Sequence, residues 1–146
     1  MKRRIIWVVV SCLMGLALLA TSCTKAVPTP TLALENTVWV LKSYGESGKL
    51  QSVLPYAEVT ALFDSGTTQV AGSAGVNRYF GAYKLDGNKL IIPGSTLVIT
   101  AMAGPQPLMD QETEFLKSLQ AAESYKIEGD KLTITCGGKV LIFTKK

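Results

Sequence analysis

Short runs of β-branched and aromatic residues, separated by glycine and proline, recur along most of this chain. Residues 37–44 (TVWVLKSY) form the first run, and Gly45 ends it. Such runs are typical of β-strands, and the breaks are typical of turns. The pattern predicts strands over residues 37–44, 59–63, 67–71, 79–85, 89–92, 96–100, 124–127, 131–135 and 139–144.

One stretch follows helical spacing instead. Its apolar positions fall on a single helical face, at Leu108, Phe115, Leu116, Leu119 and Ala122. Pro105 and Pro107 suit a helix start. Three acidic residues, Asp110, Glu112 and Glu114, suit the positive N-terminal end, and Lys117 lies three residues after Glu114, a favourable spacing for an ion pair. We expect the apolar face to cover a sheet; an exposed, partner-binding helix is the alternative.

The strand and helix patterns together predict a mainly β (α+β) fold, with a small antiparallel sheet or partial barrel and one packed helix. The folded unit runs over residues 34–146, about the size of one compact domain. Residues 23–33 contain two prolines and three threonines and no aromatic residue. This composition predicts an extended tether.

Two ten-residue segments nearly repeat each other. Residues 83–92 read YKLDGNKLII, and residues 125–134 read YKIEGDKLTI. Each places an acidic residue, glycine and Asn or Asp between alternating strands, which is hairpin chemistry. The two segments arose either by duplication or because the same turn sequence suits both hairpins. In both cases Asp86, Glu128 and Asp130 are explained as turn residues, which weakens their case as catalytic carboxylates.

The first 23 residues have the layout of an export signal. Basic residues 2–4 precede an apolar run over residues 5–20, and Leu19-Ala-Thr-Ser-Cys23 closes it. The run is shorter than the ~20 residues that cross a bilayer as a helix. The closing sequence resembles a bacterial lipobox, which implies cleavage between Ser22 and Cys23, a signal peptide over residues 1–22, and lipid on Cys23. A transmembrane anchor and a plain secretory signal are the alternatives.

Charge and cysteine content narrow the function. The chain has 15 basic and 11 acidic residues, but three of the basic residues belong to the signal, so the mature net charge is only 12 − 11 = +1. We therefore expect no nucleic-acid partner. With Cys12 removed and Cys23 acylated, Cys136 is left without a disulfide partner. Its period-two spacing from Leu132 and Ile134 predicts a buried core thiol.

Catalytic chemistry has few candidates in this sequence. The chain contains no histidine, which removes the usual general base, imidazole metal ligand and Ser-His relay. No Gly-x-Ser-x-Gly elbow or phosphate loop is present. Glu112 and Glu114 fall on different helix faces and so do not form an acid–base pair. We predict a protein that is not an enzyme and that binds no cofactor and no metal.

The glycine-rich segment 72–83 (GSAGVNRYFGAY) is open to two interpretations. Its glycines either bring the backbone close to a ligand or only allow turns and close strand packing. Asn77 suits a side chain that satisfies the turn backbone. Asn77, Arg78 and Tyr79 are nevertheless the candidates for contact with a ligand or partner, although Tyr79 suits the core equally well.

The order of these motifs resembles the META domain, as in HslJ-like, heat-shock-linked envelope proteins. The resemblance rests on residues 37–41 (TVWVL), 72–83, 100–103 (TAMA) and 109–119 (MDQETEFLKSL). It implies a small, mostly β domain with one helix, in secreted or membrane-attached proteins, and no established reaction. The family pattern usually has a cysteine at each of two positions that hold Val76 and Gly104 here, so this chain lacks a cross-link that relatives can form.

The sequence therefore predicts an envelope lipoprotein, membrane-attached through Cys23, whose domain serves binding or stress-related support. Its location would be the outer membrane facing the periplasm where the host has one, and otherwise the outer face of the cell membrane. Thr24 rather than Asp after the lipidated position is compatible with outer-membrane delivery. A carrier of a small apolar ligand and an inhibitor of an envelope hydrolase are the alternatives, with an envelope protein as partner in the second case.

Overall fold

The structure, a computed structural model, describes residues 33–146. The predicted signal peptide, the predicted lipidation site Cys23 and nearly all of the predicted tether lie outside these residues. The elements are β1 (Val38–Glu46), β2 (Lys49–Ser52), β3 (Thr60–Asp64), β4 (Gln69–Ser73), β5 (Arg78–Ala82), β6 (Lys84–Asp86), β7 (Lys89–Ile91), a 3-10 turn (Gly94–Thr96), β8 (Val98–Ile99), α1 (Gln106–Gln120), β9 (Ser124–Glu128), β10 (Lys131–Cys136) and β11 (Lys139–Lys145).

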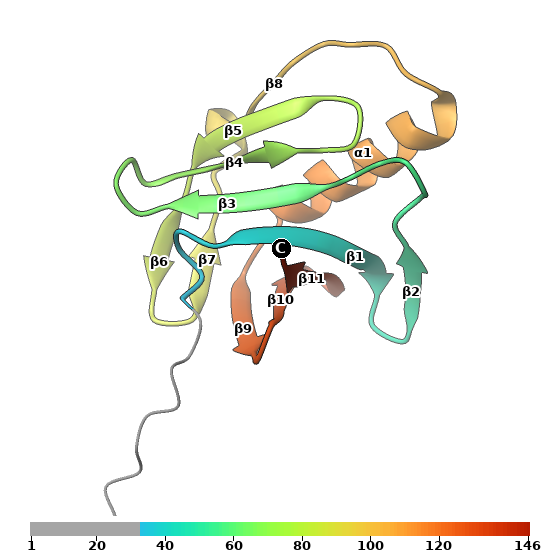
Figure 1. Cartoon of the computed structure of the whole chain (residues 1–146). Helices are drawn as coiled ribbons and strands as arrows, with labels where there is room; N and C mark the ends of the chain where they lie inside the picture. Colours follow the sequence, from blue (N-terminus) through green and yellow to red (C-terminus); the bar gives the residue numbers. More distant parts are fainter. Residues whose placement is uncertain (1–32) are drawn as a thin grey trace, which may run out of the picture.

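All the strands belong to one curled antiparallel sheet with the shape of a half-barrel, and helix α1 packs against it (Figure 1). The strand order is β6-β7-β9-β10-β11-β1-β3-β4-β5-β8, and β2 adds to β1 beside this path. The first long strand therefore lies at the centre, between β11 and β3. This confirms the predicted fold class.

The core lies between the sheet and the helix. Trp39, Phe115 and Phe143 have no solvent-exposed surface. Phe115 contacts Tyr79 and Phe143 edge to face, with ring centroids 5.6 and 6.4 Å apart. The Trp39 indole donates a hydrogen bond to the Leu34 carbonyl over 3.0 Å, so burial of the large ring leaves no polar atom unpaired. The expected helix face, including Leu116, Leu119 and Ala122, is buried in this core.

The strand pattern was predicted well, with three local differences. Residues 49–52 form β2, which no apolar alternation indicated, because all four of its residues are exposed. The expected strand over residues 79–85 breaks between β5 and β6, where the Tyr83 amide bonds to the Thr68 carbonyl instead of a sheet neighbour. The expected strand over residues 96–100 is reduced to the two residues of β8, since residues 94–96 form a 3-10 turn.

The helix begins as predicted, but its acidic residues have other roles. Pro105 caps α1, and its first turn contains no acidic residue, so the macrodipole explanation was wrong. Glu114 pairs with Lys139 of β11, not with Lys117. Glu112 is buried. Tertiary contacts, absent from any argument about an isolated helix, decide where these carboxylates go.

The two near-repeats form the predicted hairpins. Gly87 and Gly129 occupy their turns with φ of 59° and 58°, a left-handed conformation that favours glycine. The two hairpins also pair with each other. β7 lies beside β9, and the Tyr125 amide donates a hydrogen bond to the Asn88 carbonyl over 2.9 Å. Within residues 33–146, no helix is long and apolar enough to span a bilayer.

Candidate functional site

A buried polar network joins the glycine-rich segment to helix α1, and it is the most specific polar arrangement in the domain. One carboxylate oxygen of Glu112 accepts hydrogen bonds from the backbone amides of Val76 (3.1 Å) and Asn77 (2.7 Å). Its other oxygen accepts from the Asn77 side-chain amide over 2.7 Å. Glu112 is 4% exposed, so these three donors replace the water that an ionised carboxylate would otherwise bind.

The Asn77 side chain uses all of its hydrogen-bonding groups. Its nitrogen donates to Glu112 and to the Met102 carbonyl, and its oxygen accepts from the Thr100 hydroxyl (2.8 Å) and the Met102 amide (2.7 Å). This donor and acceptor arrangement permits only one orientation of the amide. Asn77 thus ties together the β4–β5 turn, the segment after β8 and helix α1.

Glycine is required at position 72 because another backbone lies directly on it. A β-carbon there would lie 2.0 Å from the Thr60 carbonyl oxygen. The same carbonyl accepts a hydrogen bond from the Tyr79 hydroxyl over 2.9 Å, and the Thr60 hydroxyl accepts one from the Ser73 amide. Burial raises the pKa of the Tyr79 phenol well above its ordinary value of 10. The backbones of β3 and β4 can therefore approach this closely only because Gly72 has no side chain.

The three predicted contact residues, Asn77, Arg78 and Tyr79, lie next to one another where β5 begins, but their side chains have different environments. Asn77 is 2% exposed and Tyr79 is 1% exposed, so both are structural parts of the core. Arg78 alone points to solvent. The structural interpretation of the glycine-rich segment thus describes Asn77 and Tyr79, and only Arg78 has surface available to a partner.

Val76 and Gly104, the two positions where the family pattern has cysteines, are neighbours in space. A β-carbon built on Gly104 would lie 3.4 Å from the Val76 β-carbon and 2.7 Å from one of its methyl carbons. Disulfides join β-carbons at about 3.5–4.5 Å. In this chain the Val76 side chain fills the space above Gly104, so the geometry agrees with the cross-link that the resemblance implies for these two positions.

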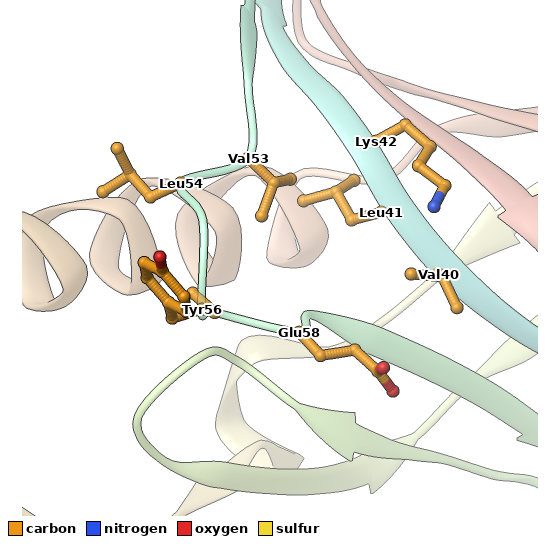
Figure 2. Close-up of a pocket in the computed structure, with 8 residues that line it drawn as sticks. Val40, Leu41, Lys42, Val53, Leu54, Tyr56 and Glu58 are labelled. Atoms are coloured by element: carbon orange, nitrogen blue, oxygen red, sulfur yellow. The ribbon is translucent and has the colours of Figure 1, made fainter.

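An open cleft of about 470 Å³ lies between β1 and the segment before β3 (Figure 2). Leu41 and Val53 point toward each other across it, and Lys42 and Glu58 lie at its border (Figure 2). Tyr56 projects fully into solvent with a φ of 70°, an unusual conformation for a bulky residue. The lining of the cleft combines β1 with the loop before β3, a juxtaposition that no pattern of contiguous residues could indicate.

Gln111 holds this segment to helix α1. Its side-chain oxygen accepts a hydrogen bond from the Leu54 amide over 2.7 Å, while its side-chain nitrogen is buried without a partner. Sequence reasoning missed both Gln111 and the buried role of Glu112. The sequence pattern assigned Glu112 only to the acidic start of the helix, and Gln111 appeared only within the motif over residues 109–119.

Cys136 is a buried free thiol, as predicted. Burial, and to a smaller extent the nearby Glu123 charge, raises the pKa of this thiol to about 12. A thiol in this state is a poor nucleophile at neutral pH. Within the part of the chain that the structure describes, no three side chains from His, Cys, Asp and Glu gather as a metal site.

Comparisons with known proteins agree with this geometry. The META domain family model matches residues 32–146. A solution structure of a protein from Burkholderia xenovorans is similar, with a TM-score of 0.67, 25% identity, and coverage of 77% of this chain and 83% of that one. A second solution structure (TM-score 0.59, 19% identity, coverage 77% and 94%) shares the fold. So does a DUF4847 family protein from Bacteroides vulgatus (TM-score 0.53, 15% identity, coverage 76% and 93%). A search of curated proteins found no match.

Proposed function

We propose, from the premise that this chain belongs to the META domain family, that it is an envelope lipoprotein whose folded domain is a non-catalytic support or binding module. Lipid on Cys23 would hold the domain at a membrane, and residues 24–33 would set its distance from the surface. An HslJ-like role under envelope stress is part of this proposal.

The sequence Leu19-Ala-Thr-Ser-Cys23 after a short apolar run carries the proposal. The apolar run over residues 5–20 is shorter than the ~20 residues that a helix needs to cross a bilayer. The small residues before Cys23 suit signal cleavage. Multiple acyl chains on one residue would give firm attachment, because each buried CH₂ contributes ~0.8 kcal/mol. On this basis the protein faces the periplasm from the outer membrane where one exists, or else covers the outer face of the cell membrane.

The chemistry of the domain supports a role other than catalysis. Its buried carboxylate, Glu112, is occupied by three hydrogen-bond donors of the fold. Glu114 and Glu128 pair with lysines. The chain has no histidine, the usual general base, and these three carboxylates of the described residues are already engaged by other groups of the fold.

Two other functions are less well supported. A carrier of a small apolar ligand would need an enclosed apolar cavity, whereas the described clefts open at the surface and aromatic rings fill the space under the helix. An inhibitor that inserts the segment 72–81 into a hydrolase would need that segment to protrude, whereas its turn is bound to Glu112.

Fractionation of cells expressing the full chain tests the proposal. The wild-type protein should sediment with membranes, and its N-terminal peptide should carry acyl mass on Cys23. Cys23→Ser should release the protein into the soluble fraction, whereas Cys136→Ser, the matched control in the folded domain, should leave it membrane-bound. An unacylated N-terminal peptide, or membrane retention of a correctly cleaved Cys23→Ser protein, would contradict the proposal.

A further inference from the structure

The outer face of the half-barrel carries an unbroken apolar row that crosses five strands. The strand register aligns Val38 of β1, Leu62 of β3, Ala71 of β4, Phe80 of β5 and Val98 of β8. We call these five residues the outer row. At a strand spacing of about 4.8 Å, it is roughly 19 Å long. Alternation along each strand turns these residues away from the core, which is why Phe80 and Val98 remain 48% and 50% exposed.

The β8 end of the outer row lacks the charges that normally protect a sheet edge. Val98, Ile99 and Met102 are 50%, 38% and 62% exposed, and residues 90–109 include no charged residue. Edge strands of soluble domains usually carry lysine or another charge against unwanted association. An apolar patch that continues onto such an edge marks an interaction surface.

The charges beside the outer row favour a partner that has both an apolar part and negatively charged groups. Lys42 and Arg78 stand on the same outer face, and neither forms an ion pair with any residue among 33–146. Two acidic residues lie near these cations and the outer row. The Asp64 carboxylate already accepts hydrogen bonds from the Gly66 amide and the Thr67 hydroxyl, and Glu58, which borders the same cleft as Lys42, pairs with Lys146. Apolar side chains flanked by free cations are typical of surfaces that lie on anionic lipid.

The point at which the chain enters the domain lies next to the outer row. The Asn36 amide donates to the Phe63 carbonyl over 2.7 Å, one residue from Leu62. Twelve residues lie between Cys23 and Asn36, so thirteen residue-to-residue steps limit that distance to at most about 47 Å whatever path the chain takes. An anchor this close gives the face a high effective concentration at the lipid, so a weak intrinsic affinity is sufficient.

We propose that the outer row, with β8 and Met102, rests on the surface of an anionic lipid bilayer. This inference depends on the proposed lipid anchor for its location in the cell. Phe80, Val98 and Met102 contact the boundary between headgroups and acyl chains, while Lys42 and Arg78 attract the anionic headgroups. The opposite side of the sheet and helix α1 then face away from the membrane.

Tryptophan quenching on vesicles tests this orientation. The mature chain, residues 23–146, is coupled through its Cys23 thiol to maleimide lipid in phosphatidylethanolamine–phosphatidylglycerol vesicles with brominated acyl chains. Phe80→Trp adds a reporter on the outer row, and Ile91→Trp adds a matched one, because Ile91 is also 50% exposed but lies on β7. Trp39 is buried and common to both variants.

We expect the added tryptophan fluorescence to be quenched at least twofold more in Phe80→Trp than in Ile91→Trp, and Val98→Glu in the Phe80→Trp background to abolish the difference. Equal quenching in the two variants would overturn the proposal. So would a protein-concentration-dependent emission shift of Phe80→Trp without vesicles, which would assign the face to a second copy. Because the coupling is chemical, these results are independent of whether cells acylate Cys23, which the Cys23→Ser fractionation decides.

Discussion

Two segments of this domain contact helix α1 through neighbouring residues, yet they are held very differently. The turn after β4 is bound by Glu112, a carboxylate with three donors, and Asn77 adds two further bonds to Met102. The segment before β3 is bound by Gln111 through a single hydrogen bond to the Leu54 amide. Half of the Gln111 amide has no partner, and Tyr56 projects into solvent two residues further on.

The difference shows how one helix can support both a rigid and a loose connection. Hydrogen bonds to an ionised acceptor are about twice as strong as neutral ones, and a network with every group paired loses much when any member is removed. A single neutral bond beside an unpaired donor stabilises far less. We therefore expect residues 74–77 to be the more rigid segment, and the cleft beside residues 53–58 to be the more adaptable one.

The largest expected effect comes from removing the close approach that supports the rigid segment. Gly72→Ala would place a carbon 2.0 Å from the Thr60 carbonyl oxygen, and backbone on both strands would have to separate. We expect a loss of about 4 kcal/mol of unfolding free energy or failure to fold, measured by urea denaturation. Gly94→Ala is the control, since its new carbon meets only the Gln120 side chain at 3.5 Å. Similar stability of the two variants would refute the packing argument.

Removal of the Glu112 carboxylate should have the next largest effect. Glu112→Ala leaves the Val76 and Asn77 amides buried without acceptors, at a cost of about 3 kcal/mol. Glu112→Gln keeps one acceptor oxygen and should cost less than half as much. Chemical denaturation gives both values. If Glu112→Ala cost no more than about 1 kcal/mol, the bonds to the carboxylate would not be what rigidifies this turn.

A disulfide beside the Glu112-bound turn should have the opposite effect and raise the stability of the rigid segment further. Val76→Cys together with Gly104→Cys places two thiols where the β-carbons are 3.4 Å apart. Closing this loop should add about 2 kcal/mol to the oxidised protein relative to the reduced one. Melting with and without reductant measures the gain. Cys136 remains buried and should stay a free thiol, and a mixed disulfide to it would contradict the geometry.

The smallest effect is expected at the loose segment. Gln111→Ala removes one neutral hydrogen bond together with an unpaired donor, so the loss should be about 1 kcal/mol. Tyr56→Ala, a matched change at a fully exposed position of the same segment, should alter stability by less than about 0.5 kcal/mol. Hydrogen exchange should be faster over residues 53–58 than over residues 74–77 in the wild type. The reverse order would remove the basis of the comparison.

Sequence patterns predicted the parts of this protein that local physics controls. Alternation and turn residues located nearly every strand, and the acidic-glycine turns of the two near-repeats form as expected. β2 escaped prediction because a fully exposed strand has no apolar alternation. Gln111 and Glu112 escaped because a polar helix residue is read as solvent-facing unless its partner, more than 30 residues away along the chain, is known.

By itself, the sequence determined most of the strand and helix content and the burial of Cys136. It also supplies the pattern over residues 1–23 from which the export and lipidation signal of the functional proposal is predicted. These depend on contiguous residues and their period. Only the tertiary structure decided that Glu112 binds the glycine-rich turn, that Val76 lies over Gly104, and that apolar residues of five strands align as one outer row. Each of these brings together residues from separate elements, and strand register and helix placement, rather than local propensity, set their distances.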